Sequence, residues 1–126
     1  PASEAAYALF ANNAELYRRD VSSTIDIQNR LKLSKGRKWL LARAKKGSVE
    51  INESQDFETF FKEYNVHLNE KYGVSAVHSP KEMQLLKDRF PNNIKLYIAS
   101  DEEGFLGGTI LYCTKQVVHA LFILIN

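Results

Sequence analysis

The sequence has one cysteine, no long apolar run and little net charge. The single cysteine, Cys113, excludes an internal disulfide framework and an all-cysteine metal site, and it fits a reducing compartment. The longest apolar run is about nine residues, which is too short to span a membrane. A net charge of +2 selects no class of partner. The N-terminus lacks the basic and then apolar layout of a signal peptide, so we expect a soluble cytoplasmic protein.

Familiar catalytic and metal motifs are missing as well. The three histidines and the scattered carboxylates do not have metal-ligand spacing, so no metal is expected. No G-x-S-x-G sequence marks a nucleophile. The 126 residues, 44% of them hydrophobic, suffice for one domain with a core but not for two conventional ones. The order of the predicted helices and strands is therefore the main indication of fold and function.

Residues 89–126 predict an antiparallel meander. The meander consists of three apolar runs. In the first run, residues 94–99, Ile94, Leu96 and Ile98 alternate with more polar neighbours, which is the period of a strand with one buried face. Short polar turns separate the runs, so neighbouring strands can pair antiparallel. The last run is apolar almost throughout and is expected to be a central strand covered on both faces. The three runs are 94–99, 105–113 and 117–125.

Two amphipathic helices precede the meander and follow a short strand at 49–52. The first begins at Ser54, ends at Gly73 and carries an aromatic stripe that we interpret as packing on a sheet. His67 lies off this stripe and is expected in solvent. The second opens with Ser79-Pro80-Lys81-Glu82, a capping box with proline in the first turn. The stripe comprises Phe57, Phe60, Phe61, Tyr64, Leu68 and Tyr72, and the second helix has core positions Met83, Leu86 and Phe90.

The N-terminal part has a different composition. Residues 2–17 predict a short helix, and the β-rich residues 21–27 predict a lone strand. Eight of the seventeen lysines and arginines then lie within residues 30–46, where Ser34 can cap a helix that ends at Gly47.

This basic helix has two interpretations. It can bind an anionic partner, such as the phosphates of a nucleic acid, a cofactor or an acidic lipid. It can equally be a solvated surface with its lysines in water, which is the more common case. Trp39 is interpreted as a core anchor, because it adjoins Leu40 and Leu41 and shares an apolar side with Ala42 and Ala44.

From residue 49 onward the predicted order is β-α-α-β-β-β, in an α+β protein. The succession VEIN, DFETFFKEYNVHLNEKYG, SPKEMQLLKDRF, IKLYIAS, FLGGTILYC and VVHALFILI resembles the first half of the GNAT acyltransferase fold. The preceding TIDI and GRKWLLARAKKGSVEI are similar to the segment that leads into the second acyltransferase-like unit of FemAB-type proteins. Residues 1–48 are accordingly interpreted as a lead-in, and residues 49–126 as the first half of a GNAT-like domain.

The resemblance implies acyl transfer to an amine, from acetyl-CoA or another acyl-CoA, or from aminoacyl-tRNA in the FemAB branch. The run 117–125 matches the fourth strand, so the backbone of Leu121, Phe122 and Ile123 is expected to face the acyl-CoA. A glycine-rich turn at the next helix would hold the pyrophosphate, and none follows in this sequence. We therefore expect either a fragment or the loss of that site, and no catalysis by these residues alone.

Three side chains are candidates by the same resemblance. His119 is the candidate general base, because an imidazole titrates near neutral pH. Tyr112 is the candidate general acid that returns a proton to the thiolate, and His78 is the candidate substrate-binding residue. For each one, an ordinary packing or loop role remains the alternative.

Three hypotheses of function remain. The first is an incomplete GNAT-like N-acyltransferase domain. The second is a tRNA-binding or other nucleic-acid-binding module that uses the basic helix 34–46. The third is a non-catalytic domain that keeps only the fold. In addition, an apolar strand at 117–125 with an open edge can pair with a strand of a second chain, so a homodimer through this strand is expected.

Overall fold

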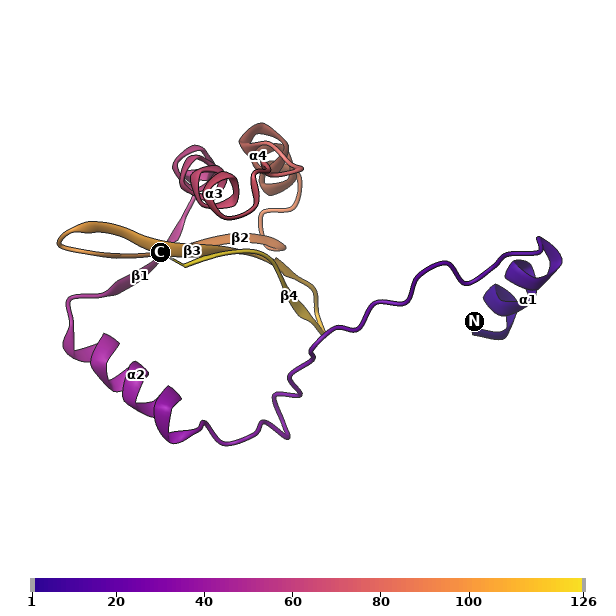
Figure 1. Cartoon of the computed structure of the whole chain (residues 1–126), viewed down its shortest axis with the longest axis horizontal. Helices are drawn as coiled ribbons and strands as arrows, with labels where there is room; N and C mark the ends of the chain where they lie inside the picture. The colour runs from indigo at the N-terminus through magenta and orange to yellow at the C-terminus, as the bar shows by residue number, and fades with distance from the viewer. Residues whose placement is uncertain (1, 126) are drawn as a thin grey trace. The chain divides into compact units, whose positions relative to one another are not determined.

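The computed structural model describes residues 2–125, and the side chains of residues 4–125. The chain divides into two compact units, Pro1–Leu33 and Ser34–Asn126. The first unit contains helix α1, Ala2–Ala11, followed by residues without regular structure. The helix predicted within residues 2–17 is thus confirmed in its first part (Figure 1).

The strand predicted at residues 21–27 is wrong. These residues are irregular, and all of them are exposed. A β-rich composition describes side chains that fit a half-buried pleated surface, and here no strand lies alongside to supply that surface. The segment ends in a local turn, in which Asp26 accepts hydrogen bonds from the Gln28 backbone at 3.0 Å and from the Asn29 side chain at 2.7 Å.

Helix α2, Lys35–Lys46, has the predicted ends. The Ser34 hydroxyl accepts from the Arg37 backbone N–H at 3.3 Å, and Gly47 is the C-cap residue. No residue of this helix is buried, so the prediction of Trp39 as a core anchor is wrong. Neighbouring helical residues point about 100° apart, so Leu40 and Leu41 beside the tryptophan form no common stripe with it.

The second unit has one antiparallel sheet in the order β1-β2-β3-β4. Its strands are β1 (Glu50–Ser54), β2 (Ile94–Asp101), β3 (Gly104–Cys113) and β4 (Val118–Ile125). The predicted meander of the last three strands is therefore confirmed (Figure 1). With four helices in the described residues, the protein is of the α+β class.

Strand β4 is at an edge of this sheet, so the expectation of a central strand covered on both faces is wrong. Among the described strands it pairs only with β3. Phe122 and Leu124 are buried on one face, whereas Ile123 and Ile125 are 58% and 74% exposed on the other. The side chains on one face of β4 therefore belong to the core, whereas no described residue covers those on the other face.

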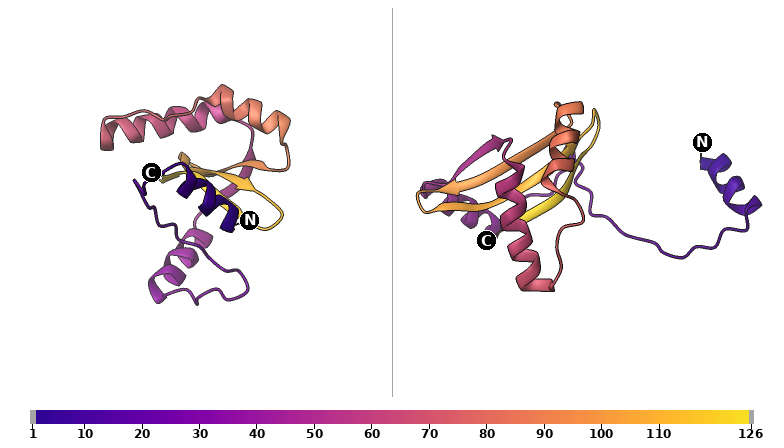
Figure 2. Two further views of the ribbon diagram at one scale, coloured as in Figure 1. Left: turned by 90° about the vertical axis from the view of Figure 1, so that its right-hand side faces the viewer. Right: turned by 90° about the horizontal axis from the view of Figure 1, so that it is seen from above.

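Helices α3 (Phe57–Tyr72) and α4 (Pro80–Arg89) lie on one face of the sheet, as Figure 2 shows. Helix α3 is capped by Asp56, which accepts from Thr59 N–H at 2.9 Å, and not by Ser54, whose hydroxyl accepts from the Asp56 N–H instead. The predicted stop at Gly73 is confirmed, because this glycine has the left-handed φ of 67°. The predicted capping box at the start of α4 is also confirmed.

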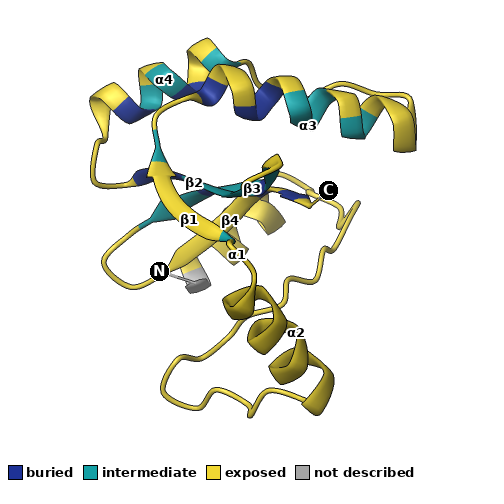
Figure 3. Cartoon of the chain, turned by 90° about the vertical axis from the view of Figure 1, so that its left-hand side faces the viewer, coloured by how far each residue is buried: buried dark blue, intermediate teal, exposed yellow. Residues whose placement is uncertain are grey.

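The core lies between these helices and the sheet, where the buried residues of both layers face each other (Figure 3). Phe60 packs edge-to-face on Phe61, with ring centroids 5.5 Å apart. The aromatic stripe thus packs on the sheet as predicted in its first half, while Tyr72 at its end is exposed. Phe90 was predicted as core but caps the end of α4 and is exposed, because the helix stops before Pro91. The buried apolar residues are Phe57, Phe60, Phe61, Met83, Ile94, Leu96, Ile110, Phe122 and Leu124.

Candidate functional site

A β-bulge interrupts the pairing of β3 with β4. Ile110 pairs with Phe122, whereas the next residue, Leu111, pairs with Ala120. Leu121 is consequently the extra residue, with no partner of its own on β3. A bulge of this kind bends the strand and disturbs the ladder locally, and bulges are frequent beside active sites. The bulge falls within residues 121–123, which were expected to face an acyl-CoA.

The free edge of β4 offers backbone groups at a defined position. The carbonyl of Phe122 accepts from the Thr109 hydroxyl at 2.8 Å, and the carbonyl of Leu124 lies against Gly107, so both point toward β3. Because successive residues of a strand direct their backbone groups to opposite sides, Ile123 presents its N–H and C=O to the free edge. This donor and acceptor are the groups that an extended ligand pairs with on an exposed strand.

The three residues expected to face an acyl-CoA have different surroundings. Phe122 is buried, with its ring centroid 5.3 Å from that of Phe61 and 5.6 Å from that of Tyr64. Leu121, in the bulge, is 39% exposed, and the side chain of Ile123 is largely exposed. The Phe122 side chain therefore anchors the strand in the core, while its two neighbours leave the edge accessible.

Tyr112 and His119 are directly opposite each other in the β3–β4 pair. Cross-strand partners share one face of a sheet, so the fold brings these two candidates together. The Tyr112 hydroxyl donates to the Met83 sulfur at 3.6 Å, which shows that this face is the one covered by the helices. Burial raises the pKa of Tyr112, whereas His119 is exposed. The phenol is sheltered and the imidazole is accessible.

His78 lies near the same strand. Its ring centroid is 6.0 Å from that of Phe122, at an interplanar angle of 84°. Its Nδ1 atom is 3.9 Å from Oε2 of Glu82, a carboxylate held by the capping box. The hydrogen bonds from the backbone and hydroxyl of Ser79 lower the pKa of Glu82. The side chain of His78 thus lies on the helix-covered side of β4, beside its buried anchor.

A groove of about 330 Å³ lies between the C-terminal half of α3 and the end of β4. His67 lines it and is half-buried, although the sequence analysis expected it in solvent. The signal for this groove was present in the sequence, because Tyr64, His67 and Lys71 follow one another at i, i+3 and i+7 on one side of a helix. Its full lining is Tyr64, His67, Leu68, Lys71, Tyr72, Ile123 and Ile125.

The groove combines one cation with aromatic and aliphatic walls. The Lys71 ammonium lies 5.3 Å from the centroid of the Tyr72 ring. Within residues 2–125, Lys71 forms no ion pair with a carboxylate. Ile123 and Ile125 line the groove although their side chains lie on the other face of the sheet, so the groove opens at the free edge of β4. The groove and the free edge of β4 therefore form one candidate site.

The sequence matches no model of a known protein family and no curated protein. No helix within the described residues is both long and apolar enough to cross a bilayer. Residues 2–125 also contain no cluster of three or more histidine, cysteine, aspartate or glutamate side chains that could bind a metal.

Proposed function

We propose that residues 49–125 form part of a GNAT-like N-acyltransferase domain, which transfers an acyl group from a CoA thioester to an amine. The free backbone groups of Ile123, beside the bulge at Leu121, support this proposal most directly. The arm of an acyl-CoA contains secondary amides, and such amides pair with a strand edge as a peptide backbone does. The β-α-α-β-β-β order from β1 to β4 is compatible with that fold.

The bound acyl-CoA would supply an activated carbonyl on a sulfur leaving group. Ile123 would hold its arm through the outward N–H and C=O. A pyrophosphate would need a glycine-rich turn that leads into a helix. Gly107 and Gly108 lie within β3 and pair with β4, so they do not substitute for such a turn.

Two side chains on the helix-covered face have the properties of an acid and a base. An exposed imidazole at His119 can accept the proton that the amine loses. A tyrosine hydroxyl is protonated at neutral pH, and burial, which raises the pKa of Tyr112, does not change this, so the group holds a proton for a departing sulfur. Their cross-strand pairing places both near the start of β4, where His119 is four residues before Ile123.

The groove between α3 and the end of β4 would receive the part of the acceptor that lies away from its amine, because His119 is at the start of the strand. Its wall of Ile123 and Ile125 borders the edge where the acyl-CoA is proposed to lie. The Lys71 ammonium favours an acceptor that also carries a negative group, and the rings of Tyr64 and Tyr72 favour an apolar body. His78, close to Phe122, would contact the acceptor from the loop before α4.

Binding of acetyl-CoA tests the proposal. We expect millimolar acetyl-CoA to raise the unfolding midpoint of the protein and to shift the backbone amide resonance of Ile123. The variant Ile123→Pro removes the outward N–H without removing a ladder hydrogen bond, so it should fold and lose the stabilisation. Val118→Pro, on the same edge near the other end of β4, is the matched control.

A domain that keeps only the fold predicts the opposite result. No stabilisation by millimolar acetyl-CoA, together with an unchanged Ile123 amide resonance, would refute the acyltransferase proposal. Stabilisation that survives Ile123→Pro would place the ligand elsewhere than on the β4 edge.

A further inference from the structure

We propose that one side of α2 binds single-stranded nucleic acid, with Trp39 as a stacking platform and the surrounding cations on the phosphates. This inference is independent of the acyltransferase proposal, since α2 contributes no residue to the β4 site. Trp39, which the sequence predicted to be in the core, is exposed.

The charge of α2 is of one sign. Six of its twelve residues are lysine or arginine, and no acidic residue occurs between Asp26 and Glu50. Within residues 2–125, no lysine or arginine of α2 forms an ion pair with a carboxylate. These cations are therefore available to phosphates, whose neutralisation provides most of the affinity of proteins for nucleic acids.

Trp39 is 60% exposed in the middle of this helix. The guanidinium carbon of Arg43 lies 5.5 Å from the centroid of its ring, one helical turn further on. An exposed tryptophan leaves a large apolar surface in water, which a binding partner can cover. A flat ring beside a guanidinium is the pair of groups on which unpaired bases stack.

Helical spacing places Trp39 among the cations. Lys35 and Arg43 are four residues before and after it, and Lys46 is seven residues after it, so all four side chains follow one side of α2. Leu40 and Ala44 point to a different side. At a rise of 1.5 Å per residue, Lys35 and Lys46 are about 17 Å apart along the helix axis, so the aromatic ring lies in a stripe of that length with positive charges on both sides.

This placement favours nucleic acid over a lipid surface. A helix that lies in a membrane interface has its tryptophan with the leucines on the apolar side, opposite the lysines. In α2 the tryptophan is on the basic side instead. A single strand is favoured over a duplex, because its base faces are open for stacking while its phosphates remain in reach of Lys35, Arg43 and Lys46.

The protein provides a direct reporter, because Trp39 is its one tryptophan. Titration with a twelve-nucleotide oligo(dT) or oligo(U) should quench the fluorescence of Trp39. With about three phosphates neutralised, the logarithm of the association constant should fall with the logarithm of salt concentration with a slope of about −2. No quenching at low salt would refute the proposal.

Variants separate stacking from charge, with binding measured by the anisotropy of a labelled oligonucleotide. Trp39→Ala should weaken binding by about 5- to 150-fold, as expected for the loss of one stacked base. Leu40→Ala, a truncation of another exposed apolar side chain in the same helix, should leave affinity nearly unchanged. An equal effect of the two substitutions would overturn the stacking role.

Two further probes test the class of partner. Heparin and a duplex of the same length present anionic groups without open base faces, so Trp39→Ala should have little effect on their binding. Vesicles of phosphatidylserine and phosphatidylcholine should leave the Trp39 emission unshifted. A blue shift with these vesicles, without any response to oligonucleotides, would identify an acidic membrane surface and overturn the nucleic-acid proposal.

Discussion

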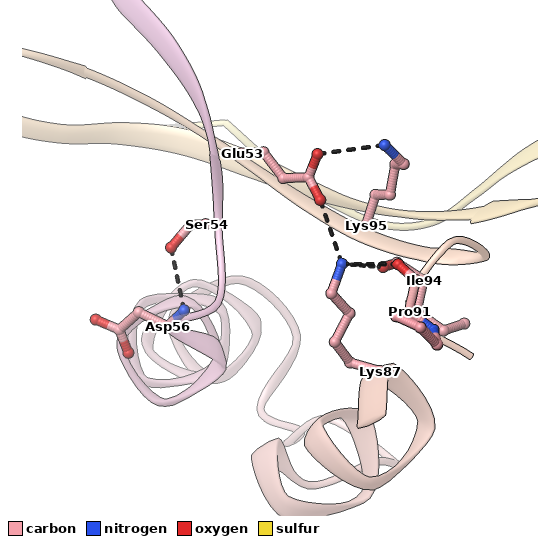
Figure 4. A network of polar contacts seen from close by, with 7 residues as sticks. All are labelled: Glu53, Ser54, Asp56, Lys87, Pro91, Ile94 and Lys95. Carbon is pink, nitrogen blue, oxygen red and sulfur yellow. Dashed lines mark hydrogen bonds and ion pairs between the residues drawn. The ribbon is translucent and has the colours of Figure 1, made fainter. Parts of the chain in front are cut away.

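The Nζ atom of Lys87 lies 3.2 Å from Oε1 of Glu53, and this pair joins α4 to β1 across the end of β2 (Figure 4). Lys87 is only 8% exposed, and its ammonium also donates to the carbonyls of Pro91 at 3.0 Å and Ile94 at 2.9 Å. Glu53 in turn accepts from Lys95 at 3.3 Å. A buried charge destabilises a fold unless it is paired and hydrogen-bonded, and the three acceptors of Lys87 meet this requirement.

Replacing Lys87 by methionine should destabilise the protein. The substitution keeps most of the length of the side chain but leaves the Pro91 and Ile94 carbonyls without their donor. We expect a loss of about 2 kcal/mol, the usual effect of hydrogen bonds to a charged group. Urea unfolding measures it. Lys95→Met, which removes the more exposed partner of Glu53, is the control and should have a smaller effect; equal effects would show that the buried ammonium has no special role.

The same pair predicts a dependence of stability on pH. The hydrogen bonds from Lys87, and then from Lys95, lower the pKa of Glu53 below its ordinary value of 4.5. The stabilisation from a lowered carboxyl pKa is complete above the pKa of the unfolded chain and is lost as the pH falls through the folded pKa. Glu53→Gln should therefore lose less stability than the wild type between pH 7 and pH 3 in urea titrations. Identical losses would contradict this account.

Gly108 should not tolerate a larger residue. A Cβ atom at this position would lie 2.9 Å from the Tyr97 carbonyl and 3.1 Å from the ring of Phe60. Forcing a methyl group between β3 and α3 should cost about 1 to 3 kcal/mol, as overpacking of a core does. Gly36→Ala is the control, because nothing lies within 4 Å of its Cβ position. A thermal midpoint that is lower for Gly108→Ala than for Gly36→Ala is the expected result.

The edge of β4 predicts self-association. The strand has no lysine, arginine, acid or proline to discourage pairing with another chain, and Ile123 and Ile125 are exposed on it. We expect a dimer by light scattering that grows with concentration and becomes monomeric in Ile123→Lys. Val21→Lys, at an exposed position outside the sheet, should leave the dimer intact.

Acetyl-CoA should oppose this dimer, because both are proposed to use the free backbone groups of β4. Added acetyl-CoA should therefore shift the light-scattering mass toward the monomer. A wild-type protein that remains a monomer at every concentration would refute pairing through β4, without bearing on the acyl-CoA proposal.

The sequence by itself determined the second unit in outline. The alternation of Ile94, Leu96 and Ile98 predicted β2, and Leu96 is fully buried. The capping box at Ser79 and the stop at Gly73 predicted the ends of two helices. These signals are local, because a cap or a period of two depends on residues that are close in the chain.

Tertiary structure decided what is covered and what is open. Apolar character alone did not distinguish the buried Phe122 from the exposed Ile123, because coverage depends on which face α3 and α4 occupy. The same holds for Trp39, a core residue by composition that nothing in the described chain buries. The bulge at Leu121 and the pairing of Tyr112 with His119 depend on the register between two strands, which no local pattern specifies.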